Sequence, residues 1–273
     1  MVSKKISNII WEIIGFILSF IVLVPLYYVL INSFKTQAAA AQMNLSFPTE
    51  FHIIANYIEV IKKGELFNAF KNSIIISTIS TACILLFSSM AAYIFQRRNS
   101  NVMKRIWILV LMGLIIPSSM VTMTMLCRYL KLPSLIAIIL VFIATQFPIS
   151  TFIFRGFFSS IPRDLDEAAI IDGCSSVFLF FYIIFPLLKP VIMTVFIINF
   201  IEIWNNFLFS IYLLNSSKDY VMPLTIYFFF GQYKSSWNLV FADIVLVAFP
   251  VVIAYIFAQK HIISGMVSGA VKG

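Results

Sequence analysis

The chain has few charged residues, few cysteines and few histidines, and each shortage excludes a class of protein. Charged residues make up 11% of its 273 positions and hydrophobic residues 61%, so polar groups cannot cover a water-soluble globule. The three cysteines, Cys83, Cys127 and Cys174, are an odd number without metal-binding spacing and form no disulfide framework. The two histidines, His52 and His261, are too far apart in sequence to make a local zinc motif.

The sequence also lacks the short motifs that mark nucleotide-binding and hydrolytic enzymes. It has no Gly-x4-Gly-Lys-Ser/Thr, no Gly-x-Ser-x-Gly and no His-Glu-x-x-His. We therefore predict a chain with no catalytic residues, no metal site and no bound cofactor of its own. The net charge of +8 comes from scattered basic residues that flank hydrophobic stretches, so nucleic acid is not an expected partner.

Long hydrophobic stretches take the place of these features. A helix that crosses a bilayer needs roughly 20 mostly apolar residues, and six windows satisfy this. We predict an all-α, polytopic membrane protein with a single domain over residues 1–273 and six transmembrane helices. The expected spans are about 9–31, 72–95, 106–127, 134–155, 190–214 and 239–259.

The basic residues indicate the orientation of these spans. Six spans leave both termini on one side of the membrane, and the side richer in lysine and arginine is cytoplasmic. The loops on the other side carry lysines as well, among them Lys35, but part of this excess lies in a long loop, where charge counts for less. We expect both termini in the cytoplasm, on the side that holds Lys4, Lys5, Arg97, Arg98, Lys104, Arg105, Lys260 and Lys272.

The first outer loop contains an amphipathic run. Its apolar residues recur at helical spacing, which predicts a helix with one apolar face. Such a helix either lies on the lipid headgroups or caps the bundle and contacts an extracytoplasmic partner. The residues of this face are Ile53, Ile54, Tyr57, Ile58 and Ile61.

Prolines occur inside or at the ends of most spans. A proline removes one backbone hydrogen bond, so kinks of this kind need neighbouring helices or water to satisfy the freed carbonyl. The pattern predicts a packed bundle with a pathway. The positions are Pro117, Pro148, Pro186, Pro190 and Pro250.

A polar loop at about 160–190 separates the fourth and fifth spans. Pro162 suits a first helical turn, which Ser159 or Ser160 could cap, and Asp164, Asp166 and Glu167 place negative charge at the positive end of the helix. The helix is expected to end at about Asp172. Gly173 then supplies a left-handed turn, Ser175 or Ser176 caps a second short helix, and Pro186 ends that helix.

Three stretches of the chain carry a resemblance to a known family. Glu167-Ala168-Ala169, three residues and Gly173 resemble the EAA loop of membrane subunits of binding-protein-dependent ABC importers. Asn56-Tyr57 followed by Phe70, Asn72 and Ser73, and the tail 265–273, are similar to the second membrane subunit of maltose and multiple-sugar importers. Met266, Val267 and Ser268 depart from the tail pattern of that subfamily.

This resemblance implies a fold, a role and partners. The fold would be that of a type I ABC importer permease, with a cytosolic coupling helix between helices 4 and 5. The partners would be a second, homologous permease subunit, two ATP-binding subunits that use ATP and Mg, an extracytoplasmic substrate-binding protein and a sugar, in a bacterial cell membrane. The residues that would contact the ATPase are Glu167, Ala168, Ala169, Asp172 and Gly173. The alternative is an ordinary hairpin whose acidic residues only face solvent.

Polar residues inside the fifth span suggest a substrate pathway. A carboxylate at mid-membrane is costly and usually faces the bundle interior or a water-filled cavity. At helical spacing Asn199, Glu202 and Asn206 share a face, and Asn205 can flank it. Amides and a carboxylate suit a sugar, whereas hydrogen bonding between helices is the simpler explanation.

The last outer loop is the third candidate site. By the same resemblance, Gly231, Gln232 and Tyr233 would face the substrate-binding protein, and a plain solvated loop is the alternative. A different class of function is a proton-coupled secondary carrier that uses Glu202. A polyol or a glycerol phosphate ester is an alternative substrate for the same ABC role.

Overall fold

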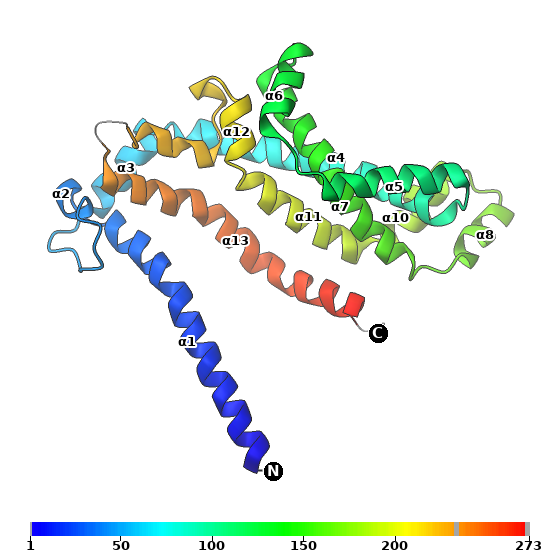
Figure 1. Ribbon diagram of the computed structural model, residues 1–273, viewed down its shortest axis with the longest axis horizontal. Helices are drawn as coiled ribbons and strands as arrows, with labels where there is room; N and C mark the ends of the chain where they lie inside the picture. Colours follow the sequence, from blue (N-terminus) through cyan, green and yellow to red (C-terminus); the bar gives the residue numbers. More distant parts are fainter. Residues whose placement is uncertain (1, 232–234, 271–273) are drawn as a thin grey trace. The chain divides into compact units, whose positions relative to one another are not determined.

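The computed structural model describes residues 2–231 and 235–270, with side chains described between 11 and 256. All regular elements in this part of the chain are helices, which confirms the all-α prediction (Figure 1). The chain divides into two compact units. Unit 1 comprises Met1–Phe67 with Thr225–Pro250, and unit 2 comprises Asn68–Leu224 with Val251–Gly273.

Four predicted spans are long apolar helices. They are α1 (Val2–Ser33), α4 (Leu66–Arg97), α7 (Ser134–Phe158) and α13 (Trp237–Ala270). Each contains a stretch that is long and apolar enough to cross a membrane, and Pro25, Pro148 and Pro250 lie inside α1, α7 and α13 without ending them. None of the most apolar 18-residue window of α1 is buried within the chain, so that helix presents its side chains to lipid or to another subunit.

The third predicted span, 106–127, contains two helices instead of one. The helices α5 (Asn101–Ile115) and α6 (Met120–Tyr129) meet at an angle of 118°, and Figure 1 shows α6 turning away from α5. The break follows from Pro117, because a proline forces the preceding residue, Ile116, into an extended conformation. Ser119 then restarts the helix, since its Oγ accepts a hydrogen bond from the backbone N–H of Thr122.

A sharp bend precedes the fifth predicted span, 190–214, and a break lies inside it. The segment formed by α9 (Ser176–Phe178), the π-helical η1 (Leu179–Ile184) and α10 (Phe185–Leu187) bends by 78° into α11 (Lys189–Trp204). The first of these segments ends at Leu187, directly after Pro186, as the sequence suggested. A short helix, α12 (Leu208–Leu213), follows α11 after a break at 205–207. The span is therefore helical at both ends but not continuous.

In unit 1 a buried asparagine holds the outer-loop helix in place. The predicted amphipathic helix exists as α3 (Ile53–Lys63), but Asn56 and Val60 form its buried side, whereas Ile54 is 75% exposed. The Asn56 amide donates hydrogen bonds to the carbonyl oxygens of Ser33 and Lys35 at 2.8 and 2.9 Å. Its oxygen accepts one from Asn238 at 2.7 Å. Hydrogen bonds thus hold α3 in place, and its exposed isoleucines can contact apolar surroundings.

Lys35, one of the lysines that do not fit the positive-inside rule, is buried in the same unit. Only 1% of it is exposed, and its Nζ donates to Asn32 Oδ1 and to the carbonyl and Oδ1 oxygens of Asn44 at 2.8–3.0 Å. Burial lowers the pKa of the Lys35 amine. This lysine therefore ties the end of α1 to the loop after α2 (Gln37–Ala40) instead of adding a surface charge.

Unit 2 contains two hydrophobic clusters. The first joins α6, α7 and α12 and includes Phe142, Ile138 and Phe209. The second joins the ends of α4, α7 and α11 to the polar hairpin. Its best-buried side chains are Ala92, Phe154, Phe158, Ile184, Leu188 and Val195.

We predict that Asn56→Ala destabilises unit 1. The substitution leaves two buried carbonyl oxygens and one amide without a partner, which costs about 2 kcal/mol or more. Thermal unfolding of the purified protein measures it. Ile54→Ala on the exposed side of α3 is the control, and equal unfolding temperatures for the two variants would contradict the assignment.

Candidate functional site

The polar hairpin between α7 and η1 is the first candidate site. Its helix α8 (Asp164–Ile171) begins two residues later than Pro162, and its N-cap, Arg163, makes no capping hydrogen bond through its side chain. The predicted caps are wrong, because the hydroxyls of Ser159 and Ser160 donate back to the carbonyls of Gly156 and Phe157. These serines complete the end of α7 and do not begin α8.

The turn after α8 has the predicted geometry. Gly173 has a φ of +79°, a left-handed conformation that only glycine adopts at little cost. The backbone N–H of Cys174 bonds to the carbonyl of Ala169 at 2.9 Å and closes the helix end. Ser175 caps the next helix, since its Oγ accepts from the N–H of Phe178 at 3.3 Å.

The two faces of α8 differ. Asp166 and Ala169 are buried within the chain, at 8% and 4% exposure. Ala169 therefore packs against its own subunit, and Ala168 is the alanine of the pair that faces outward. The remaining predicted coupling residues, Glu167, Ala168, Asp172 and Gly173, are exposed. Two apolar residues beside them, Ile170 and Ile171, are exposed as well.

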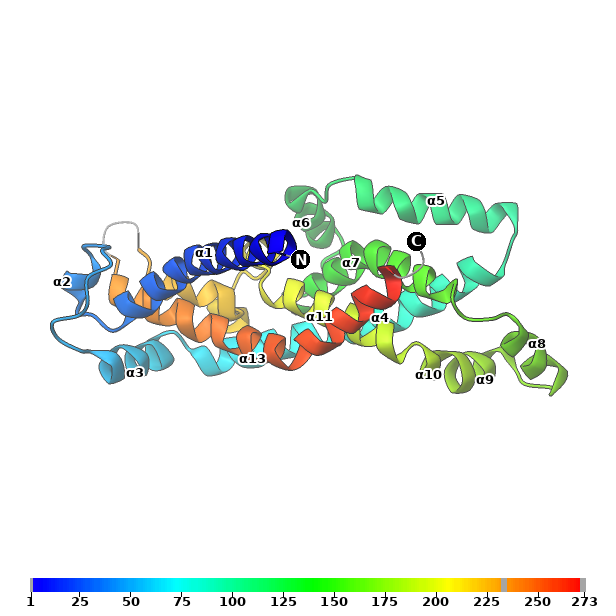
Figure 2. The same cartoon turned by 90° about the horizontal axis from the view of Figure 1, so that it is seen from below.

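A buried ion pair anchors the inner face of α8 to the end of α4. An Arg97 guanidinium nitrogen lies 2.7 Å from Asp166 Oδ2, and the Tyr93 hydroxyl donates to Asp166 Oδ1 at 2.6 Å. Arg97 also donates to the carbonyl oxygens of Ile161 and Pro162. Figure 2 shows the hairpin at the end of unit 2 where α4 and α5 are joined.

The sequence did not reveal this anchor. Asp166 looked like one of several acids in a first helical turn, and Arg97 looked like a topology signal. The two residues are far apart in sequence, so no local spacing connects them. The only signal was helical spacing, because Asp166 and Ala169 share a face of α8.

The predicted pathway residues do not form one stripe. Asn199 is 1% exposed, and its amide donates to Ser150 Oγ of α7 at 2.9 Å and to the carbonyl of Val195 at 2.8 Å. Asn199 thus joins two helices. Because α11 ends at Trp204, Asn206 lies beyond the helix, where its Oδ1 caps α12 by accepting from the N–H of Phe209 at 2.9 Å.

The other two pathway candidates are exposed. Glu202, in the last turn of α11, and Asn205, directly after it, are exposed on the surface of the chain. In the third candidate site, Gly231 is exposed and its carbonyl accepts from Ser235 Oγ at 3.2 Å. Gln232 and Tyr233 lie outside the described residues.

The described helices include four long apolar helices and two bent pairs, and an anchored polar hairpin joins them. These features define a multi-span membrane protein. The chain belongs to the family of binding-protein-dependent transport system inner membrane components, whose family model matches residues 84–267. The match covers the candidate coupling hairpin and the break at 205–207 in the fifth span.

Similar proteins extend over nearly the whole chain. A probable starch degradation products transport system permease from Thermoanaerobacterium thermosulfurigenes is 35% identical over 95% of this chain and 95% of its own length. A melibiose/raffinose/stachyose import permease from Bacillus subtilis is 34% identical over 92% of this chain and 91% of its own length. A crystal structure of a bacterial ABC transporter for alginate import matches with a TM-score of 0.81 at 21% identity, over 94% of this chain and 97% of that one, and confirms the fold.

We predict that Asp166→Ala loosens the hairpin. The substitution leaves the largely buried Arg97 without a counter-charge, which costs up to about 3–5 kcal/mol for a fully buried pair. Hydrogen exchange of the backbone at 160–178 measures it and should become faster. Asp164→Ala, which removes an exposed acid from the same helix, is the matched control.

A double variant separates the ion pair from general damage. Arg97→Met with Asp166→Leu replaces both charges by apolar groups, which is often close to neutral. Protection of the 160–178 backbone from hydrogen exchange should return towards that of the unmodified chain. If the double variant exchanges faster than Asp166→Ala, the hydrogen bonds from Arg97 to the carbonyl oxygens of Ile161 and Pro162 anchor the hairpin more than the ion pair does.

Proposed function

We propose that this chain is one of two non-identical transmembrane subunits of an ATP-driven, binding-protein-dependent importer for a sugar or an oligosaccharide. The observation that carries this proposal is the exposed face of α8, which presents Glu167, Ala168 and Asp172 on a helix anchored to the bundle. Family membership and the substrates named for similar permeases support it.

In this proposal, two partner subunits bind and hydrolyse ATP with Mg, and this chain is a non-catalytic subunit that holds no cofactor. The hairpin and both termini lie on the cytoplasmic side of a bacterial cell membrane. Glu167 and Asp172 pair with basic groups of an ATPase subunit, and the small Ala168 lets its backbone approach closely. The exposed Ile170 and Ile171 add an apolar contact to the same surface.

The proposed motion passes from the ATPase through α8 into the helices. Arg97 binds Asp166 and the carbonyls just before α8, so a displacement of the hairpin also displaces the end of α4. The hydrophobic cluster beneath α8 includes residues of α7 and α11. Because packed helices shift as rigid bodies, a push on α8 can switch the bundle between inward-open and outward-open states. A second, homologous permease subunit completes the pathway, and an extracytoplasmic protein delivers the substrate.

The substrate side of the proposal rests on Glu202 and Asn205. A carboxylate and a neighbouring amide bind hydroxyl groups by directional hydrogen bonds, which suits a sugar. Both side chains are exposed at the point where α11 ends. Asn199 and Asn206 belong to the scaffold that positions them, since their hydrogen bonds go to neighbouring helices.

We predict that Gly173→Ala uncouples ATP hydrolysis from uptake. A Cβ at this position meets no atom within 4 Å, so the effect comes from the left-handed backbone alone. That conformation costs a residue with a side chain about 1–2 kcal/mol, roughly a 5- to 30-fold change in population. Sugar uptake per ATP hydrolysed should fall in proteoliposomes that hold the complete importer.

Gly156→Ala is the matched control, because its Cβ also meets nothing and its backbone is helical. Gly173→Asn should retain more coupling, since asparagine tolerates the left-handed region. Normal coupling in Gly173→Ala, with the complex assembled, would contradict the proposed role of the hairpin.

We predict that Glu202→Gln weakens substrate transfer without unfolding the chain. A hydrogen bond to a charged group contributes about 1.5–3 kcal/mol, so uptake at limiting substrate should fall at least about ten-fold. Uptake by the complete importer measures it, with Glu12→Gln in α1 as the control for loss of an exposed carboxylate. Uptake driven by a proton gradient without an ATPase, and lost in Glu202→Gln, would instead identify a secondary carrier.

A further inference from the structure

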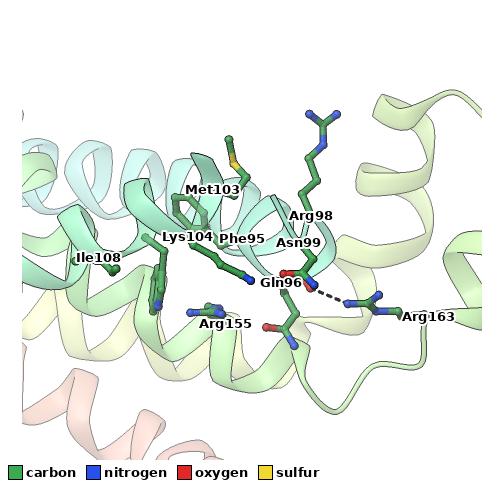
Figure 3. Close-up of a pocket in the computed structure, with 10 residues that line it drawn as sticks. Phe95, Gln96, Arg98, Asn99, Met103, Lys104, Ile108, Arg155 and Arg163 are labelled. Carbon is green, nitrogen blue, oxygen red and sulfur yellow. Dashed lines mark hydrogen bonds between the residues drawn. The ribbon is translucent and has the colours of Figure 1, made fainter. Parts of the chain in front are cut away.

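A basic pocket of about 450 Å³ lies beside the hairpin, between the end of α4, the start of α5 and the last turns of α7 (Figure 3). Four of its lining residues are basic, and the described lining contains no acidic residue: the cations are Arg98, Lys104, Arg155 and Arg163. Figure 3 shows the nitrogens of Lys104, Arg155 and Arg163 directed to the same space, whereas Arg98 points away.

The positive charge of this pocket is not neutralised by the chain. The Arg155 guanidinium carbon lies 4.3 Å from the centre of the Trp107 ring, and Arg163 donates to the carbonyl of Gln96 at 3.3 Å. Among the residues that the structure describes, the salt bridges involve other cations, so none of these four pairs with a carboxylate. Like charges held together repel, and an anion would relieve that repulsion.

The pocket lies at the ends of apolar helices. The apolar stretch of α4 ends at Arg97, α5 begins at Asn101, and α7 ends at Phe158. The wall towards the apolar part of α5 is formed by Trp107 and Ile108. A tryptophan beside basic residues is typical of the membrane–water interface. The pocket therefore has a charged side for a headgroup and an apolar side for acyl chains.

We propose that this pocket binds the phosphate group of an anionic phospholipid. Lys104, Arg155 and Arg163 contact the phosphate, and the first acyl carbons lie against Trp107 and Ile108. Basic pockets between transmembrane helices are a recurrent form of anionic-lipid site. The apolar wall favours a lipid over a soluble phosphate, which would leave that wall exposed to water.

The site also connects the lipid to the hairpin. Arg163 is the N-cap residue of α8 and lines the pocket, so a phosphate held there restrains the start of α8. The neighbouring Arg97 binds Asp166 on the opposite flank of the same element. The lipid composition around the chain then affects the order of the coupling surface.

The test is the binding of phosphatidylglycerol to the full-length chain in non-ionic detergent, measured by native mass spectrometry. Lys104→Gln should weaken binding about five-fold, since one cation near an anionic lipid contributes about 1 kcal/mol. Arg105→Gln is the matched control, because Arg105 is the next residue of α5, is exposed and does not line the pocket. Its affinity should equal that of the unmodified chain.

A second measurement locates the lipid. Phosphatidylglycerol with brominated acyl chains should quench part of the tryptophan fluorescence, and Trp107→Phe should remove that part. Thermal unfolding in lipid-free detergent shows whether Lys104→Gln keeps the fold.

Three results would overturn the proposal. Equal losses in Lys104→Gln and Arg105→Gln would mean a diffuse surface attraction. Equal binding of phosphatidylcholine would remove the role of charge. Full competition by inorganic phosphate would identify a soluble anion as the ligand. None of these measurements involves transport, so they stand apart from the test of the proposed importer function.

Discussion

The structure depends on one constraint: in apolar surroundings every backbone polar group needs a partner, and at several helix interruptions a side chain supplies it. Ser119 restarts α6, Asn206 caps α12, and Ser73 Oγ accepts the backbone N–H of Met222 at 2.8 Å. These three side chains thus serve the scaffold. A polar residue inside a span is a candidate for ligand binding only when a ligand can reach its side chain. Glu202 and Asn205 are exposed and remain candidates, whereas Asn199 is buried and its amide bonds to Ser150 and Val195.

Hydropathy predicted the helical class and located α1, α4, α7 and α13, because a long apolar run has no other way to satisfy its backbone in lipid. It did not reveal that the window 106–127 bends sharply inside or that the window 190–214 is broken at 205–207. The mean hydropathy of a window does not detect a reversal of the chain. Pro117 marks only a place where the helix can break. Whether such a proline kinks a helix or divides it depends on a cap such as Ser119 and on contacts made by distant segments.

The sequence predicted those features of the candidate site that depend only on residues adjacent in the chain. Gly173 was identified because only glycine takes a left-handed turn cheaply, and Ser175 because a serine after that turn is a natural cap. Local sequence could not predict the contacts of Asp166 with Arg97 and Tyr93, because they join residues of different helices. Local rules also assigned Asp166 to the helix dipole and Ala169 to a partner, whereas tertiary packing turns both inward.

The division of α8 into two faces explains how so short a helix can transmit a force. A helix of eight residues is not stable by itself in water. Its folded state therefore depends on the inner face, where Asp166 is bound by Arg97 and Tyr93 and Ala169 is packed in the hydrophobic cluster. In the proposed importer, an ATPase pressing on Glu167 and Ala168 meets a helix whose unfolding would break a buried ion pair. Moving α8 together with the end of α4 costs less than melting it, so the displacement reaches the bundle.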